Sequence, residues 1–292
     1  MRATAPGAGP PPAPRRDVHR SSEAVSAAMG EESVVTVALL HAAGLDHRMW
    51  RPVELELQRL GYRTRALDLP GHGDRPAPPA DFTLEDLADD VVSQLIGSQP
   101  PAEASTLVLA GVSLGGMVAQ HVALRPGGPA VSGLVLANTM AQVPAPLRDA
   151  LFERAARTQR LGMAGVLSET LGRWFDEQVQ HSSQPLMRQV SDWLLQADPD
   201  VNAQTWRAIA DLSLLPHLPQ VTAPTLVISG AGDRATPTAL AIQLSQALPR
   251  SQHIEFAGAG HLTPLEEPMR FAAELDSFAA QVAGTAPKED RA

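Results

Sequence analysis

The sequence predicts an α/β fold, a doubly wound and mostly parallel sheet with an inserted helical cap. Three observations support this fold class. Six short runs are apolar and rich in β-branched residues, as are strands buried on both faces of a parallel sheet. Helical patterns lie between most of these runs, and such alternation is typical of right-handed strand–helix–strand units. One long interval, residues 140–215, has helical patterns and no strand signal.

The individual elements follow from local patterns. Residues 82–97 begin with Thr83 as an N-cap residue and Asp86 three positions later, before apolar residues at helical spacing. Residues 236–249 form a similar helical pattern with Pro237 near the first turn, where proline is favoured. Each apolar run ends at a turn signal, and the six predicted strands are residues 34–40, 63–69, 106–111, 132–138, 224–230 and 252–256.

The interval without strands predicts a helical cap. Three helical patterns occupy residues 146–175, 186–199 and 202–215. A helical insertion that leaves a sheet after one strand and rejoins it before the next covers the carboxyl edge and creates a substrate cavity. The expected organisation is a tail at 1–32, a first core part at 33–139, the cap at 140–215, a second core part at 216–283 and a tail at 284–292.

Composition and charge narrow the function classes. The 292 residues include 23 Lys and Arg, 32 Asp and Glu and no Cys, for a net charge of −9. An acidic chain without a basic cluster is a poor partner for nucleic acid, and disulfides and Cys nucleophiles are excluded. No run is long enough to span a membrane, and no apolar secretory segment is present, so we expect a cytoplasmic protein. The scattered histidines show no metal-ligand spacing, so we expect no metal site.

A serine stands at the turn after the third predicted strand. Gly111, Val112, Ser113, Leu114 and Gly115 form a G-x-S-x-G motif between an apolar run and a helical pattern. On such a sharp turn the backbone is strained and close neighbours must be small, while the serine oxygen is exposed at a helix N-terminus. The motif therefore predicts a nucleophilic serine.

A nucleophilic serine needs a base and an acid that orients the base. Asp233 follows the strand at 224–230, and His261 lies in a glycine-rich loop after the strand at 252–256. This chain order of serine, acid and histidine predicts a catalytic triad of Ser113, Asp233 and His261. The oxyanion needs preorganised donors, and we expect the backbone N–H groups of Leu114 and Ala43 to provide them. His41, at the end of the first strand, is expected to shape the oxyanion loop by hydrogen bonding.

The motifs HAAG, LDLPGHGDRP, GVSLGG, SGAGDRATP and GAGHLTPLEEP together resemble the α/β-hydrolase superfamily over about residues 34–283. The resemblance implies the Ser113–Asp233–His261 triad, no cofactor and a structural role for His72. The segments LDHRMW, NTMAQV and RLGMAGVLSETLGRWF look like 3-oxoadipate enol-lactonases. The HAAG loop and the start directly at the first strand look instead like small methylesterases and carboxylesterases.

A second motif is rejected. Gly230, Gly232 and Ala235 fit a dinucleotide-binding fingerprint, with Glu255 ending the next strand. Too few strands follow for a nucleotide-binding fold, and Asp233 would place a carboxylate beside a pyrophosphate.

The sequence therefore predicts a serine hydrolase that cleaves a small carboxylic ester or lactone through an acyl-enzyme. Another ester specificity, carbon–carbon bond hydrolysis on the same triad, and a capped-pocket small-molecule receptor remain open, as does the oligomeric state. Arg48 and Arg173 could pair with a substrate carboxylate, but the favoured interpretation is that both are solvated surface arginines. The expected pocket-lining residues are Trp50, Met117, Trp174 and Phe175.

Overall fold

The computed structural model describes residue 1, residues 35–97 and residues 106–285. The chain divides into two units, Met1–Ser33 and Val34–Ala292, and everything below concerns the second unit. The predicted tail at 1–32 lies outside the described residues except for residue 1, and the predicted tail at 284–292 lies outside them from residue 286.

Six parallel strands form one sheet in the order β2-β1-β3-β4-β5-β6. This confirms the predicted α/β class and all six predicted strands. The four inner strands are mostly buried on both faces, whereas the edge strands β2 and β6 are largely part-exposed. The strands end together at one edge, where Leu40 pairs with Gly111 and Gly230 pairs with Phe256. The strands are β1 (Val35–Leu40), β2 (Arg63–Leu67), β3 (Thr106–Val112), β4 (Gly133–Ala137), β5 (Thr225–Gly230) and β6 (Ser251–Phe256).

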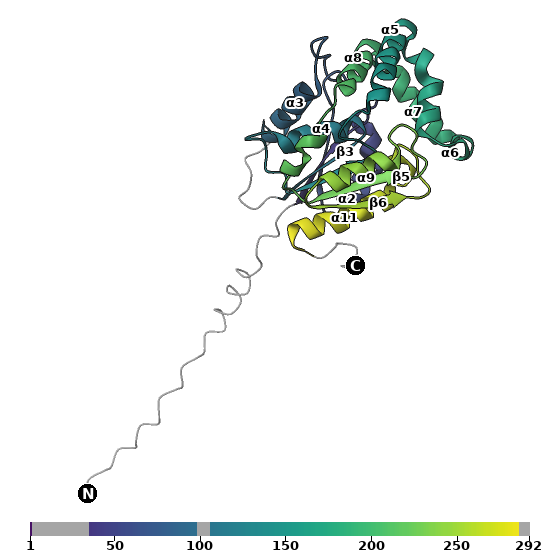
Figure 1. The fold of residues 1–292 in the computed structure, drawn as a ribbon. Coiled ribbons are helices and arrows are strands. Elements are labelled where there is room, and N and C mark those ends of the chain that lie inside the picture. The colour runs from purple at the N-terminus through teal and green to yellow at the C-terminus, as the bar shows by residue number, and fades with distance from the viewer. Residues whose placement is uncertain (2–34, 98–105, 286–292) are drawn as a thin grey trace. The chain divides into compact units, whose positions relative to one another are not determined.

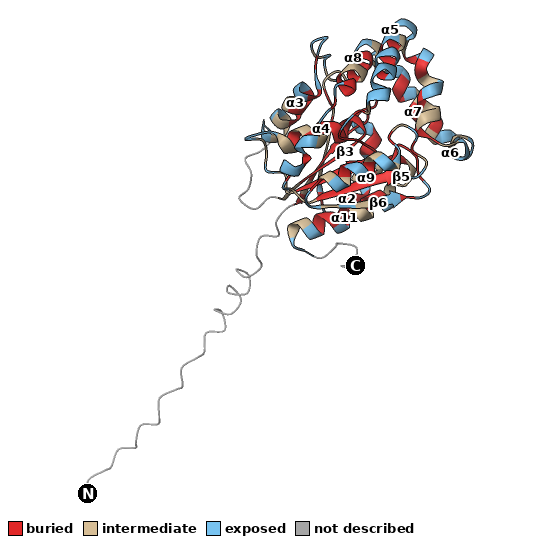
Figure 2. Cartoon of the chain, viewed as in Figure 1, coloured by how far each residue is buried: buried red, intermediate tan, exposed pale blue. Residues whose placement is uncertain are grey.

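Helices cover both faces of the sheet, so the fold is doubly wound as predicted (Figure 1). Alternate residues of β1 join opposite cores: Val37 and Leu39 pack with α2 (Arg51–Arg59) and α11 (Pro268–Ala283). Ala38 and Leu40 pack with α3 (Leu84–Gly97), α4 (Leu114–Leu124) and α9 (Thr238–Ala247). Figure 2 shows the strands as the buried centre of the described unit.

The predicted start of α3 is confirmed by its hydrogen bonds. The Asp86 N–H donates to the Thr83 hydroxyl at 3.1 Å, and the Thr83 N–H donates to the Asp86 carboxylate at 2.9 Å. Two otherwise unpaired amides at the helix start are thereby satisfied.

Helices fill the interval between β4 and β5 and gather beyond one end of the sheet (Figure 1). An antiparallel bridge between Gln142 and Ser213 joins the two segments of the chain at which this cap leaves and rejoins the core. The longest helix is kinked at Gly162, whose φ of 67° is not helical. The cap helices are α5 (Ala145–Trp174), α6 (Glu177–Ser182), α7 (Gln184–Gln196) and α8 (Pro199–Ala210).

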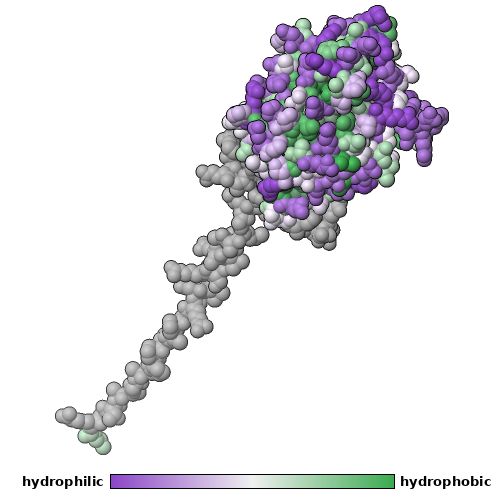
Figure 3. All heavy atoms as spheres, viewed as in Figure 1, coloured by the Kyte–Doolittle hydropathy of each residue, from purple (hydrophilic) through white to green (hydrophobic). Residues whose placement is uncertain are grey.

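Shorter helices complete the fold: η1 (His47–Trp50) precedes α2, η2 (Leu215–Gln220) precedes β5, and α10 (Thr263–Glu266) precedes α11. Hydrophilic residues predominate on the face shown in Figure 3, with apolar residues between them. Among the helices in the described part of the chain, none combines the length and the apolarity that a membrane crossing requires.

Candidate active site

Ser113 occupies the sharp turn between β3 and α4. Its backbone has φ 54° and ψ −116°, a strained conformation that few non-glycine residues adopt. The Ser113 N–H donates to the carbonyl of Ala137 at 2.9 Å, and the Gly115 N–H donates to the carbonyl of His41 at 3.0 Å. The turn is therefore fixed between the ends of β1 and β4, with its serine at the start of a helix.

The glycines of the motif are required by close backbone contacts. A Cβ on Gly115 would lie 2.2 Å from the carbonyl oxygen of Leu40, and a Cβ on Gly111 would lie 2.3 Å from the backbone of Gly115. Both distances are far below van der Waals contact. The sequence motif thus has the steric origin that was expected of it.

Asp233 and His261 form a buried pair at the same sheet edge. The Nδ1 atom of His261 lies 2.8 Å from Oδ2 of Asp233, and both side chains are almost fully buried. A carboxylate accepts, so Nδ1 carries the proton and Nε2 is left as the basic nitrogen. Burial alone would raise the pKa of Asp233, but the charge and hydrogen bond of His261 and the donors of Thr236 hold the pKa below its usual range.

The loop that carries His261 is held from two sides. The His261 N–H donates to the carbonyl of Trp174 at 2.8 Å, and the Trp174 ring stacks on the imidazole at 5.7 Å between centroids. Glu266 accepts hydrogen bonds of 3.0 Å from the amides of Gly260 and Leu262, the two neighbours of His261. Burial raises the pKa of Glu266 to about 7 despite these two amides.

Asn138 connects the acid to the histidine loop, and the sequence analysis did not identify it. Its Nδ2 donates at 3.0 Å to Asp233 and at 3.0 Å to the carbonyl of Gly260. Its Oδ1 accepts from the hydroxyl of Thr263 at 2.6 Å, and the residue is fully buried. A polar residue directly after a buried strand, at the sheet edge where sites form, is the signal that could have revealed it.

The end of β4 brings the three predicted triad positions to one place. Ala137 accepts from the Ser113 amide, and Thr139 donates its hydroxyl to the Ser113 carbonyl at 2.8 Å. Asn138, between them, contacts Asp233 and the residue before His261. Serine, acid and histidine thus come from the ends of β3, β5 and β6 around the end of β4.

The predicted oxyanion donors are available. Within the part of the chain that the structure describes, the N–H groups of Ala43 and Leu114 have no hydrogen-bond acceptor in the protein. His41 shapes this loop as predicted: Nδ1 donates to the Ala42 carbonyl at 2.9 Å and Nε2 accepts from the Leu69 amide at 3.0 Å. Burial lowers the pKa of His41 to about 4, so its ring is neutral.

The four predicted lining residues occupy different environments. Trp174 contacts His261, as described above. Trp50 packs its ring on Phe271 in the core, with centroids 5.7 Å apart, because η1 and α11 bury their apolar sides against each other. Met117 and Phe175 are likewise buried in the two apolar clusters. The Trp50 side chain is therefore fully buried in the core, and its place in a substrate pocket stays a prediction.

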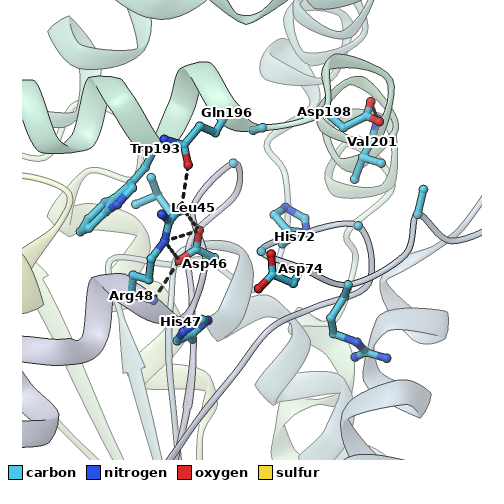
Figure 4. A pocket seen from close by; sticks show the side chains of 16 residues that line it. Leu45, Asp46, His47, Arg48, His72, Asp74, Trp193, Gln196, Asp198 and Val201 are labelled. Carbon is cyan, nitrogen blue, oxygen red and sulfur yellow. Dashed lines mark hydrogen bonds and ion pairs between the residues drawn. The ribbon is translucent and has the colours of Figure 1, made fainter.

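A polar cavity of about 320 Å³ lies between the core and the cap (Figure 4). None of the four predicted lining residues belongs to its walls. Arg48 lies in the cavity wall, but it is not open to a substrate carboxylate in the way its sequence position suggested, because its Nε and Nη2 bind Asp46. For Arg173, no hydrogen bond or ion pair is found among the described residues. The cavity is lined by residues 44–48, 71–75 and 77 and by Trp193, Gln196, Ala197, Asp198 and Val201.

Two other candidate sites are explained by protein contacts. Asp46, His47 and Asp68 place possible metal ligands within 4.8 Å of one another. However, the Arg48 guanidinium donates to the Asp46 carboxylate, and both the amide and Nδ1 of His47 contact the Asp68 carboxylate. In the rejected dinucleotide motif, the amides of Ala235 and Thr236 donate to Asp233 and are not free for a phosphate.

Known proteins resemble this chain in sequence and fold. The model of the alpha/beta hydrolase family matches residues 37–274. A pimeloyl-[acyl-carrier protein] methyl ester esterase from Vibrio vulnificus is 32% identical over 254 residues, covering 83% of this chain and 93% of the esterase. 3-Oxoadipate enol-lactonase 1 from Acinetobacter baylyi is 25% identical over 249 residues, covering 85% and 90%. The structure of a thermophilic esterase from Thermogutta terrifontis is 27% identical, with a TM-score of 0.77 and coverage of 86% and 91%.

Proposed function

This chain belongs to the α/β-hydrolase family, and on that premise we propose that it hydrolyses a small carboxylic ester or lactone through an acyl-enzyme. The observation that carries the proposal is the buried Asp233–His261 pair, at 2.8 Å, on the same sheet edge as the strained serine turn. The names of the similar proteins, an esterase and an enol-lactonase among them, support the reaction class.

In the proposed reaction Ser113 is the nucleophile and His261 is the base. Nε2 of His261 takes the serine proton while the serine oxygen attacks the carbonyl carbon. Asp233 holds the imidazole in the tautomer that leaves Nε2 basic, and its charge stabilises the imidazolium. The amides of Leu114 and Ala43 bind the oxyanion. His261 then protonates the leaving alkoxide or enolate, and it activates the water that releases the acid.

Replacement of the serine tests the proposal directly. Ser113→Ala should abolish hydrolysis of short p-nitrophenyl esters, while far-UV circular dichroism and the urea unfolding midpoint stay near those of the wild type. A fluorophosphonate probe should label the wild type at Ser113 and leave the variant unlabelled. Retained turnover in the variant contradicts the nucleophile assignment. Absence of labelling in the wild type favours the capped-pocket receptor.

A panel of substrates separates the reactions that one triad can perform. Matched esters, five-membered lactones and diketones present the same carbonyl with different leaving groups. We expect esters or lactones to be cleaved with a higher kcat/KM than diketones, because an oxygen leaving group protonated by His261 departs more readily than a carbon leaving group. Faster cleavage of a diketone than of any ester would identify a carbon–carbon bond hydrolase instead.

A further inference from the structure

The cavity between core and cap adjoins the proposed oxyanion hole. Its wall includes Gly44, the residue after Ala43, and consecutive Cα atoms are only about 3.8 Å apart. The opposite wall consists of cap residues from the end of α7 and the start of α8, including Gln196 and Asp198. One arm of a substrate whose carbonyl lies at Ala43 can therefore extend into this cavity (Figure 4).

The cationic donors in the cavity wall are already used by the protein. Arg48 binds both oxygens of Asp46 through Nε and binds Gln196 through Nη2 at 3.1 Å. Arg75 binds both oxygens of Asp90, which lies on α3. Each guanidinium is thus neutralised by its own carboxylate, which leaves little positive charge for an anionic ligand.

The hydrogen-bond acceptors in the same wall remain open. Asp74 accepts no hydrogen bond and forms no ion pair within 4 Å among the described residues, although its charge acts on Arg48 at longer range. Asp198 uses only Oδ1, which accepts from the amides of Asp200 and Val201. His72 is 96% buried, and its Nδ1 donates to the Pro70 carbonyl at 3.2 Å. Burial lowers the pKa of His72 to about 3. The neutral ring therefore presents the lone pair of Nε2, for which no partner is found in the described part of the chain.

We propose that this cavity, the acceptor pocket, binds the arm of the ester substrate and selects an arm that carries a protonated amine. The three acceptors that define the acceptor pocket are Asp74, Asp198 and His72. An ammonium group donates three hydrogen bonds and offsets the negative charge of the two carboxylates. A carboxylate arm is disfavoured, because it is repelled by their charge and has no donor for the lone pair of His72. This inference rests on the proposed esterase function and adds the substrate class to it.

A matched series of benzyl acetates tests the selection. The para substituent is aminomethyl, hydroxymethyl, methyl or carboxylate, and the rigid ring prevents the amine from attacking its own ester. We expect the aminomethyl ester to have a kcat/KM about fivefold above that of the methyl ester, since the acidic groups are solvent-exposed. The carboxylate ester should be the slowest. Equal rates for the aminomethyl and methyl esters overturn the proposal, as does a preference for the hydroxymethyl or carboxylate ester.

Variants assign the preference to the acceptor pocket. Asp74→Asn and Asp198→Asn should each lower the aminomethyl-to-methyl ratio about twofold to threefold, and Asn still caps α8 at position 198. Asp149→Asn, an exposed position on α5 outside the cavity, makes the same charge change and should leave the ratio and the basal activity unchanged. An unchanged ratio in both pocket variants contradicts the proposal.

A binding measurement separates this inference from the proposed function. In calorimetric titration, the Ser113→Ala variant should bind 4-(aminomethyl)benzyl alcohol more tightly than 4-carboxybenzyl alcohol. Adding Asp74→Asn to that variant should weaken the binding of 4-(aminomethyl)benzyl alcohol. If wild-type protein lacks all esterase activity but this binding order holds, the proposed function fails and the acceptor pocket stands. If p-nitrophenyl acetate is hydrolysed but the binding order is absent or reversed, the acceptor pocket alone fails.

Discussion

Asn138 provides the sharpest test of how the site is held together. Asn138→Ala removes the amide that joins Asp233, Gly260 and Thr263 and leaves their three polar groups buried without this partner. Asn138→Gly removes the same amide but tolerates the left-handed φ of 47° at this position. The pair of variants therefore separates the hydrogen bonds from the backbone strain.

The three hydrogen bonds set the expected size of the effect. A neutral hydrogen bond contributes about 1 kcal/mol, and one to a charged group such as Asp233 contributes about 2 kcal/mol. With one bond to the charged Asp233 and two neutral bonds, Asn138→Gly should therefore lower the free energy of unfolding by ~4 kcal/mol. Asn138→Ala should cost about 1 kcal/mol more, because an alanine side chain crowds the carbonyl at positive φ.

Urea unfolding followed by circular dichroism measures these costs. In the same samples, kcat for p-nitrophenyl acetate should fall about tenfold, because Asp233 loses a donor that orients it toward His261. If the free energy of unfolding of either variant lies within about 1 kcal/mol of the wild-type value, the hydrogen-bond network is refuted. If Asn138→Ala is more stable than Asn138→Gly, the strain argument is refuted.

Two further predictions concern backbone contact and pH. Gly115→Ala should destabilise the fold by ~2 kcal/mol or more in urea, because its Cβ would lie 2.2 Å from the Leu40 oxygen. The control Gly172→Ala, where a Cβ meets nothing within 4 Å, should be neutral or stabilising; equal effects would contradict the steric reading. Burial raises the pKa of Glu266 from 4.5 to about 7, so the folded state favours the protonated carboxyl group. The contribution of Glu266 to the free energy of unfolding is therefore complete below pH 4.5 and is lost as the pH rises through about 7. Between pH 5 and 8, Glu266→Gln should remove up to ~3 kcal/mol of the pH-dependent change in the free energy of unfolding. If the free energy of unfolding changes with pH as steeply in the variant as in the wild type, Glu266 is not the group that titrates.

The four inner strands could be predicted because strands buried on both faces have nearly continuous apolar sequences. The edge strands β2 and β6 are part-exposed and carry polar residues, so alternation with helical patterns and turn signals marked them instead. The cap was harder. Residues 146–175 read as one helical segment, but the structure is kinked at Gly162, where no side chain opposes a φ of 67°. The short helix α6 had no signal because none of its six residues is buried, so no apolar periodicity marks it.

The location of Ser113, Asp233 and His261 could be predicted because each residue follows a strand at the same edge of the sheet. The supporting contacts could not. Asn138 meets Asp233 and Gly260 across 95 and 122 residues of chain, and only the strand order places them together. Pocket-lining residues such as Trp50 could not be assigned because a buried aromatic residue has the same sequence signal in a core as in a pocket. For Arg48, the sequence could not show that Asp46 both caps η1 and binds the guanidinium.

The cap contacts the proposed catalytic residues as well as covering them. Trp174, the last residue of α5, accepts the His261 amide and stacks on the imidazole, so a cap residue helps fix the proposed base. The acceptor pocket likewise takes Asp74 from a core loop and Asp198 from the cap. Because one cap bears on both the base and the substrate arm, a change in α5 that moves Trp174 should alter kcat, whereas a change at the start of α8 should alter KM. Exchanging the whole cap for that of a relative should therefore change both constants together.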